Sequence, residues 1–385
     1  MPATATQRRL LHAFPADKTM ANILDYLIWR GDVPFSVSPF NEVDGLILSE
    51  FSYLPMEKVF TGGYSEELTI REIAKRYDSS AVDEKDRILS FEYDNRLLML
   101  MSNSDRFGDM RVTGYVNIIS RAAEFQFSAV TCVTDDGVTF VSFRGTDGTV
   151  VGWKEDFTFS YSDQTSGQSY AMSYLNTRLA GSTGPVRVGG HSKGGNFAVY
   201  ASAFCDPMLR ERITDIYSYD APGFRKDITE SADYKRILPL VHSYIPESSV
   251  VGMLLENDTE HVTVKSSVNG ILQHLAYNWE VIGKIFARTD KLSRSGAVVN
   301  RAISGMLEDL SDEDRKTFTE AVFGVLEAPD KMTMKEIVKG KFAAYSTMFR
   351  ALRELPPEKQ TVLKDALKQL AKSAIRSDDK KDSAK

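Results

Sequence analysis

Short segments rich in β-branched residues alternate with helical segments through the middle of the chain, and this alternation restricts the fold more than any other feature. Between about residues 125 and 275, four segments have the composition of strands: "VRVGG", "ITDIYSY", "ILPLVHSYI" and "HVTVKSS". An apolar helical segment lies between the first two. Strands that alternate with helices predict a mostly parallel sheet covered by helices. The sequence therefore predicts an α/β fold whose functional groups gather at the carboxyl edge of the sheet.

The segments before this region carry other patterns. "FSAVTCVTDDGVTFVSFRGT" alternates in polarity around Asp135-Asp136-Gly137, which predicts a β-hairpin. Residues 20–110 contain segments that predict helices, and residues 85–121 have a largely helical pattern. The N-terminal part is therefore expected to be mainly helical.

After about residue 285 the pattern becomes wholly helical. Ser311 with Asp314, and Thr333 with Glu336, have the spacing of capping boxes, and each pair precedes apolar residues at helical intervals. We regard the C-terminal helices as a candidate surface for self-association or for binding a partner. We predict an α/β domain over residues 1–288 with its core at about 120–280, an all-helical annex over residues 289–375, and a disordered tail over residues 376–385.

The composition argues against several classes of function. A formal charge of −6 does not suit a nucleic-acid-binding surface, which is normally basic. Cys132 and Cys205 lie outside any CxxC pair, so neither a disulfide framework nor a cysteine-ligated metal is expected. No run of about 18 apolar residues is present, and the N-terminus lacks the apolar core of a signal peptide. We therefore expect a cytoplasmic protein without metal, cofactor, nucleic-acid partner or transmembrane segment.

The segment "VRVGGHSKGGN" places Ser192 between glycines, directly after a predicted strand and before a predicted helix. Gly-x-Ser-x-Gly in this context is typical of the nucleophile elbow, a sharp turn that exposes the serine hydroxyl above a sheet. Glycines suit this turn because it leaves no room for flanking side chains. The alternative is a tight glycine-rich turn whose serine only caps the helix. Phosphate binding fits less well, since "GGHSKGG" lacks the Walker spacing.

A serine hydroxyl needs a base to take its proton, and a histidine is expected in this role. The chain has five: His12, His191, His242, His261 and His274. His274 follows the last predicted strand, where the chain order serine, acid, histidine places the base. His191 adjoins the serine and is expected to point away from it. We therefore predict His274 as the base, and its alternative is a partly exposed loop histidine.

Two carboxylates compete for the role of the acid that orients the base. Asp220 in "YSYDAPGF" ends the strand after the nucleophile's helix, whereas Glu247 in "SYIPESSVVG" ends the next strand, which is the commoner position. Asp220 is favoured because a short carboxylate at a strand end is held more rigidly. Its alternative is a turn aspartate before Ala-Pro-Gly. Glu247 stays the second candidate.

Acyl transfer also requires donors for the developing oxyanion. The backbone N–H after the nucleophile belongs to Lys193, and a second donor is expected from a loop after an earlier strand. Thr146, after Arg144-Gly145 at the end of a predicted strand, offers its N–H and its hydroxyl. The alternative for Thr146 is an ordinary hairpin exit.

Together these motifs resemble the class 3 lipases, a family of α/β-hydrolases. That family pairs an "RGT" or "RGS" oxyanion loop, followed by Trp and Asp, with a "GHSLGG" elbow. This sequence has Arg144-Gly145-Thr146 with Trp153 and Asp156, and then "GHSKGG" at residues 190–195. The resemblance covers about residues 120–280 and is closer still to an uncharacterised bacterial branch of lipase-like hydrolases. It implies the α/β-hydrolase fold.

The resemblance also implies roles for individual residues: Ser192 as nucleophile, His274 as base, and Thr146 and Lys193 as oxyanion donors. Class 3 lipases carry their acid in a "DxVP" motif, whereas the corresponding residues 249–252 have the sequence "SVVG". This departure gives a second reason to favour an acid elsewhere in the chain.

Lys193 is the other departure, because the family has leucine there. A cation beside the nucleophile favours an oxyanion, lowers the pKa of a neighbouring histidine and attracts an anionic group of a substrate. The alternative is a solvated lysine that points off the turn.

The leading interpretation is a serine hydrolase of the lipase or esterase type, which cleaves an acyl ester through an acyl-enzyme on Ser192. Lipids, small carboxyl esters and thioesters all fit as substrates, and apolar residues around 147–175 are a candidate lid. The alternative is a catalytically silent lipase-like module whose C-terminal helices bind a partner.

Overall fold

The computed structural model describes residues 20–83, 88, 90–120, 125–146, 158–249, 251–253, 255, 259–268, 270–290, 311–327, 357 and 361. Eight strands form one sheet and lie side by side in the order of the sequence. Strands β1 to β4 pair antiparallel, and β4 to β8 pair parallel. Their bounds are β1 Glu67–Thr69, β2 Arg111–Ser120, β3 Phe125–Val133, β4 Thr139–Phe143, β5 Val186–His191, β6 Ile213–Tyr219, β7 Val241–Pro246 and β8 His261–Val264.

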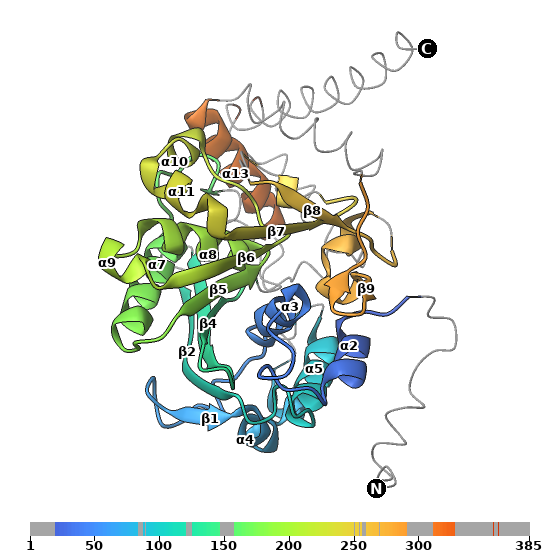
Figure 1. Cartoon of the computed structure of the whole chain (residues 1–385). Helices are drawn as coiled ribbons and strands as arrows, with labels where there is room; N and C mark the ends of the chain where they lie inside the picture. The colour runs from blue at the N-terminus through green and yellow to red at the C-terminus, as the bar shows by residue number, and fades with distance from the viewer. Residues whose placement is uncertain are drawn as a thin grey trace, which may run out of the picture.

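Helices cover both faces of this sheet (Figure 1). Helices from the N-terminal part of the chain pack on one face: α2 (Ile23–Arg30), α3 (Glu42–Phe51) and α5 (Phe91–Ser102). Helices that connect the parallel strands pack on the other: α7 (Ser166–Ala180), α8 (Lys193–Phe204) and α11 (Ala232–Ile237). The shorter elements are α4 (Ile70–Arg76), α9 (Pro207–Arg210), α10 (Lys226–Thr229), and the hairpin of β9 (Val281–Ile282) and β10 (Ile285–Phe286).

The strands supply side chains to both cores in alternation. In β4, Phe140 packs with the N-terminal helices and Val141 packs with α7 and α8. In β6, Tyr217 packs with the N-terminal helices and Ile216 packs with α7 and α8. Because successive side chains of a strand point to opposite faces, a strand covered on both faces needs apolar residues at consecutive positions. The predicted α/β-hydrolase fold, a mostly parallel sheet flanked by helices, is confirmed.

Two sequence predictions require correction. Residues 85–121 have a largely helical pattern, but α5 ends at Ser102 and β2 spans Arg111–Ser120. Valine, threonine, tyrosine and isoleucine dominate β2, and such residues favour a strand once a partner such as β3 lies beside it. The predicted strand "ILPLVHSYI" begins only at Val241, because Leu238–Leu240 forms a turn of 3₁₀ helix that contains a proline.

Other local predictions are confirmed. The hairpin of β3 and β4 turns at Gly137, whose φ of 80° suits glycine. Helix α13 (Asp312–Glu327) begins after Ser311, whose hydroxyl accepts the Asp314 N–H at 3.2 Å. Most of the predicted helical annex, including Thr333 and Glu336, lies outside the described residues, and the predicted domain boundaries stay predictions. No helix in the described ranges is long and apolar enough to cross a membrane.

A buried ion pair holds the N-terminal helices together. Asp44 on α3 accepts two hydrogen bonds from Arg106, at 2.8 and 2.5 Å, and both side chains are fully buried. The hydroxyl of Tyr26 on α2 donates to the same carboxylate at 2.9 Å. Removing one partner of such a pair leaves an uncompensated buried charge.

We expect Asp44→Asn to lower the free energy of unfolding by about 3–5 kcal/mol, because Arg106 then has no buried counter-ion. Urea unfolding measures this loss. Asp109→Asn is the matched control: Asp109 pairs with Arg71 at 2.9 Å, but its side chain is 79% exposed, so the expected loss is below about 1 kcal/mol. Equal losses in the two variants would contradict the prediction.

Candidate active site

Ser192 occupies a strained turn between strand β5 and helix α8. Its φ of 58° and ψ of −134° lie in a region that non-glycine residues rarely adopt. Backbone hydrogen bonds fix the turn: the Ser192 N–H donates to the Tyr219 carbonyl at 2.8 Å, and the Gly195 N–H donates to the Ser192 carbonyl at 2.9 Å. Such strain at the carboxyl end of an interior strand indicates a functional constraint on the serine.

The glycines around Ser192 allow α8 to approach the sheet closely. A side chain at Gly194 would overlap the backbone carbonyl of Phe143 at the end of β4. A side chain at Gly195 would lie 2.6 Å from the Cβ of Ala221, and one at Gly190 would overlap the backbone of Gly194. The glycine spacing therefore reflects backbone packing of β5 and α8, as expected for an elbow.

Three polar side chains from separate segments meet at the carboxyl edge of the sheet. The Oγ of Ser192 lies 3.0 Å from Nε2 of His274, and Nδ1 of His274 lies 2.6 Å from Oδ2 of Asp220. Asp220 follows β6, and His274 ends a short 3₁₀ segment, Gly270–His274. Asp220 is fully buried, whereas the His274 side chain is 20% exposed. This is the serine, histidine and carboxylate geometry that activates a hydroxyl for nucleophilic attack.

The second carboxylate oxygen of Asp220 is held by the segment that replaces the "DxVP" motif. The Ser249 hydroxyl donates to Oδ1 of Asp220 in a short hydrogen bond, and the Gly252 N–H donates to the same atom at 3.0 Å. Gly252 also needs its small size, because a Cβ would lie 2.5 Å from that oxygen. Ser249 and Gly252 thus donate hydrogen bonds to Asp220, which follows a different strand. The sequence analysis missed this relation.

The other acid candidate, Glu247, lies at the end of β7, where its N–H donates to the Val264 carbonyl at 3.0 Å. Its carboxylate is not the partner of His274, whose Nδ1 bonds Asp220. The structure therefore brings Asp220, and not Glu247, to the histidine. The catalytic role of either residue stays a prediction.

The two predicted oxyanion donors lie on either side of the elbow. A Cβ at Gly145 would lie 2.6 Å from the His191 carbonyl and 3.0 Å from the Cβ of Ser192, so the loop that carries Thr146 packs against the turn. Lys193 is the first residue of α8, and helix N-termini point N–H groups outward. Both donor roles stay predictions. Trp153 and Asp156, like residues 147–157 of the candidate lid, lie outside the described residues, whereas its residues from Ser166 onward belong to α7.

The alternative of a solvated Lys193 side chain is wrong. Lys193 is fully buried, and its Nζ lies 5.8 Å from the ring centroid of Phe197. The reason is its place at the start of α8, which packs on the sheet beside α7. A lysine stem of four methylene groups can pack like an apolar side chain in such a position.

N-terminal helices contact the segment around the histidine, which we call the base loop (residues 272–279). The side chain of Asn22 donates to the Tyr277 carbonyl at 2.6 Å, and the Tyr277 hydroxyl donates to Asp94 at 2.6 Å. Burial and the charge of Glu50 raise the pKa of Asp94 well above its ordinary range. Sequence reasoning gave these helices no part in the site, because no motif links residues so far apart in the chain.

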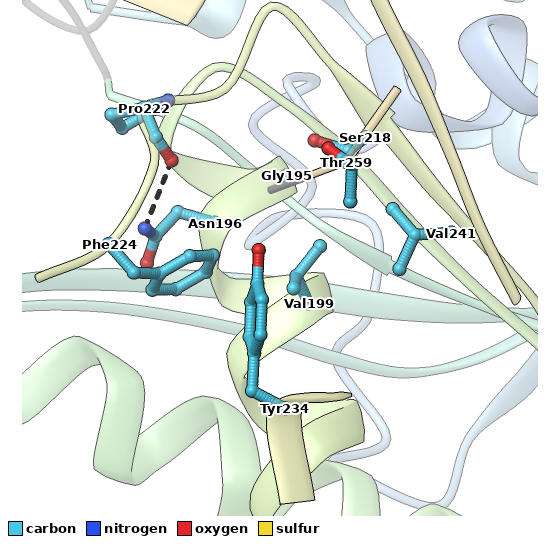
Figure 2. Close-up of a pocket in the computed structure, with 9 residues that line it drawn as sticks. All are labelled: Gly195, Asn196, Val199, Ser218, Pro222, Phe224, Tyr234, Val241 and Thr259. Atoms are coloured by element: carbon cyan, nitrogen blue, oxygen red, sulfur yellow. Dashed lines mark hydrogen bonds between the residues drawn. The ribbon is translucent and has the colours of Figure 1, made fainter. Parts of the chain in front are cut away.

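A small pocket lies behind the elbow and not at the triad (Figure 2). Asn196 crosses one side of it and donates to the Pro222 carbonyl at 3.1 Å. The centre of a water molecule can occupy about 10 Å³ of this pocket, so the pocket has room for roughly one water molecule. It is therefore too small for an acyl chain. Its lining residues are Gly195, Asn196, Val199, Ser218, Pro222, Phe224, Tyr234, Val241 and Thr259.

Within the part of the chain that the structure describes, no cluster of three His, Cys, Asp or Glu side chains is arranged to hold a metal ion. Cys132 and Cys205 are both buried with free thiols.

A family model described as Mbeg1-like matches residues 101–324, more than half of the chain and all three residues of the site. The chain belongs to the Mbeg1-like family. Two solved structures resemble this Mbeg1-like chain, each at 14% sequence identity. The Rhizomucor miehei lipase in its native propeptide complex matches over 66% of this chain and 74% of its own, with a TM-score of 0.37. The M37 lipase matches over 66% of this chain and 83% of its own, with a TM-score of 0.36. No curated protein matches the sequence. The predicted bacterial branch of lipase-like hydrolases stays a prediction.

The close packing at the elbow predicts a large effect of a single methyl group in this Mbeg1-like protein. We expect Gly194→Ala to lower the free energy of unfolding by about 1–3 kcal/mol or more, because the new Cβ overlaps the Phe143 carbonyl. Gly181→Ala is the control, since its φ is −84° and its nearest neighbour would lie 3.4 Å away, so a change within about 0.5 kcal/mol is expected. Urea unfolding of both variants measures the difference, and a tolerated Gly194→Ala would contradict the tight approach.

Proposed function

We propose that this protein is a serine hydrolase that cleaves an acyl ester, a lipid or a smaller carboxyl ester, through an acyl-enzyme on Ser192. The contact series from Ser192 to His274 to Asp220, with separations of 3.0 and 2.6 Å, carries the proposal. Membership of the Mbeg1-like family and the α/β-hydrolase fold support it. The proposal makes Ser192 the nucleophile, His274 the base and Asp220 the orienting acid.

In the first half of the proposed reaction, Nε2 of His274 accepts the hydroxyl proton as Oγ of Ser192 bonds to the carbonyl carbon of the ester. The carbonyl oxygen becomes an oxyanion, for which the N–H groups of Thr146 and Lys193 are the proposed donors. Asp220 keeps Nδ1 of His274 protonated and stabilises the imidazolium. As the carbonyl re-forms, the carbon–oxygen bond to the alcohol breaks, and His274 gives its proton to the leaving oxygen.

In the second half, His274 accepts a proton from water while the water oxygen bonds to the acyl carbon. The bond to Oγ of Ser192 breaks, the imidazolium returns its proton to the serine, and a carboxylic acid leaves. The substrate and the water approach from the exposed side of His274, since Asp220 is enclosed on the other. Overall, one ester and one water give one alcohol and one acid.

The alternative function, a catalytically silent module, had its support in the loss of the "DxVP" acid. Asp220 lies 2.6 Å from Nδ1 of His274, so that loss no longer favours a silent site. Binding of a partner through the C-terminal helices stays a separate prediction. No described contact favours a particular partner.

We expect a fluorophosphonate probe to label the intact protein and to fail with Ser192→Ala, because the probe reacts only with an activated serine hydroxyl. Labelling followed by mass spectrometry measures this. Ser173→Ala, on the exposed side of α7, is the control and should label like the wild type. Failure to label the wild type, where a reference hydrolase is labelled, would remove the enzyme proposal. Labelling that persists in Ser192→Ala would remove the choice of nucleophile.

We expect Asp220→Asn to slow hydrolysis of a short acyl ester by about 10³- to 10⁴-fold, because the amide orients the imidazole wrongly and cannot stabilise its charge. Glu247→Gln should change the rate by less than about 3-fold. A chromogenic ester assay on both variants measures the ratio. The opposite order would make Glu247 the acid, and two unaffected variants would exclude both.

A further inference from the structure

The residue before the nucleophile, His191, connects helix α3 to the base loop. Its Nε2 lies 2.9 Å from the backbone carbonyl oxygen of His274. Its Nδ1 lies 3.0 Å from Oε1 of Glu50, the penultimate residue of α3, and 3.3 Å from the hydroxyl of Tyr53. As expected from the sequence, its ring points away from the hydroxyl of Ser192. It contacts instead the residue that carries the proposed base.

Both ring nitrogens of His191 face oxygen atoms that accept hydrogen bonds. The His274 carbonyl can only accept, so Nε2 must carry a proton. On the other side, the Tyr53 hydroxyl lies 3.3 Å from both Nδ1 and the His191 carbonyl, so it can accept from Nδ1 or donate to it. The Glu50 carboxylate lies 3.0 Å from Nδ1. A proton on Nδ1, which makes the ring an imidazolium, is the state that pairs with this carboxylate.

The surroundings of His191 favour this charge. The exposed fractions of the two side chains are 6% for His191 and 2% for Glu50, so water screens their attraction little. Burial lowers the pKa of His191, but Glu50, Asp220 and the hydrogen bond to the His274 carbonyl raise it above the ordinary value. Among the described residues, titratable groups from several elements face His191 or its ion-pair partner Glu50. They are Tyr53 from the turn after α3, Asp94 from α5, Asp220 after β6, and His274 and Tyr277 from the base loop.

Asp94 is another buried carboxyl group of this region, and its environment differs from that of Glu50. Its oxygens accept from the hydroxyls of Tyr277 and Ser90, at 2.6 and 2.8 Å, with no cation among these partners. Burial and the charge of Glu50 favour a protonated Asp94. Glu50 is therefore the group that carries the counter-charge of His191.

We propose that Glu50 is a positioning residue for the proposed base, His274. Glu50 keeps His191 charged. The charged ring of His191 holds the His274 backbone and keeps the His274 side chain unprotonated at lower pH. This inference rests on the proposed function of the site. The rings of His191 and His274 lie 4.8 Å apart between centroids and are inclined by 32°. A fixed positive charge at this separation opposes a second proton on His274.

Replacing Glu50 by glutamine isolates the charge from the packing. The amide side chain is nearly the same size and can donate an N–H to Nδ1 of a neutral His191, whose Nε2 proton still reaches the His274 carbonyl. A buried histidine without its counter-ion loses its charge, since burial favours the neutral form. The repulsion on His274 then disappears, and protonation of His274 occurs at higher pH.

We expect Glu50→Gln to move the acid limb of the pH profile for fluorophosphonate labelling upward by about 0.5–1 pH unit, with a plateau rate within about 3-fold of the wild type. Labelling rates between pH 4.5 and 9 measure both quantities. Asp94→Asn is the matched control, because it removes a buried carboxyl group on the neighbouring helix without removing a charge, and its acid limb should not move. An unmoved limb in Glu50→Gln, or a limb that moves downward, would overturn the inference.

A second measurement needs neither a variant nor activity. Nitrogen-15 NMR of the histidine rings in the wild type should show His191 doubly protonated throughout the pH range in which His274 titrates. A neutral His191 in that range would overturn the inference even if Glu50→Gln failed to fold. If the wild type did not label at all, the proposed function would fail, while the NMR titration would still decide the state of His191.

Discussion

The site depends on one backbone constraint, the close approach of helix α8 to the ends of strands β4 and β5. Contact between Gly194 and the Phe143 carbonyl leaves no space for a side chain, and the chain reverses through Ser192 at a φ of 58°. The turn raises the serine hydroxyl above the carboxyl edge of the sheet, where the loops after β6 and β8 also end. Without that approach, Ser192 would not lie within hydrogen-bond reach of His274.

Around this turn, the carboxylate that contacts His274 does not come from the segment that corresponds to the acid motif of class 3 lipases. The residues that correspond to the family's acid motif carry no carboxylate, yet Ser249 and Gly252 donate hydrogen bonds to Asp220 on the preceding strand. Asp220 itself has a φ of 45°, so its backbone, like that of Ser192, is held in an unusual conformation by its neighbours.

Local signals made part of this arrangement predictable. The strand, glycine turn and helix around Ser192 are contiguous in sequence, and Asp220 and His274 follow predicted strands, so chain order alone placed them at one edge. The strand β2 was mistaken for helix because its partner β3, and not its own periodicity, decides its conformation. Glu50 and Asp94 were missed for a related reason: burial gives them their chemistry, and a carboxylate within a helical pattern looks like a solvated one until the tertiary contacts are known.

Helix α3 serves two purposes at once, since it covers one face of the sheet and supplies the carboxylate that faces His191. Yet α3 precedes residue 101, where the family model begins to match. Chains that match the family model and have the same elbow sequence, "GHSKGG", can therefore differ in the groups that surround His191. Under the role proposed for Glu50, changes in this N-terminal layer would change the working pH of the site without altering Ser192, His274 or Asp220.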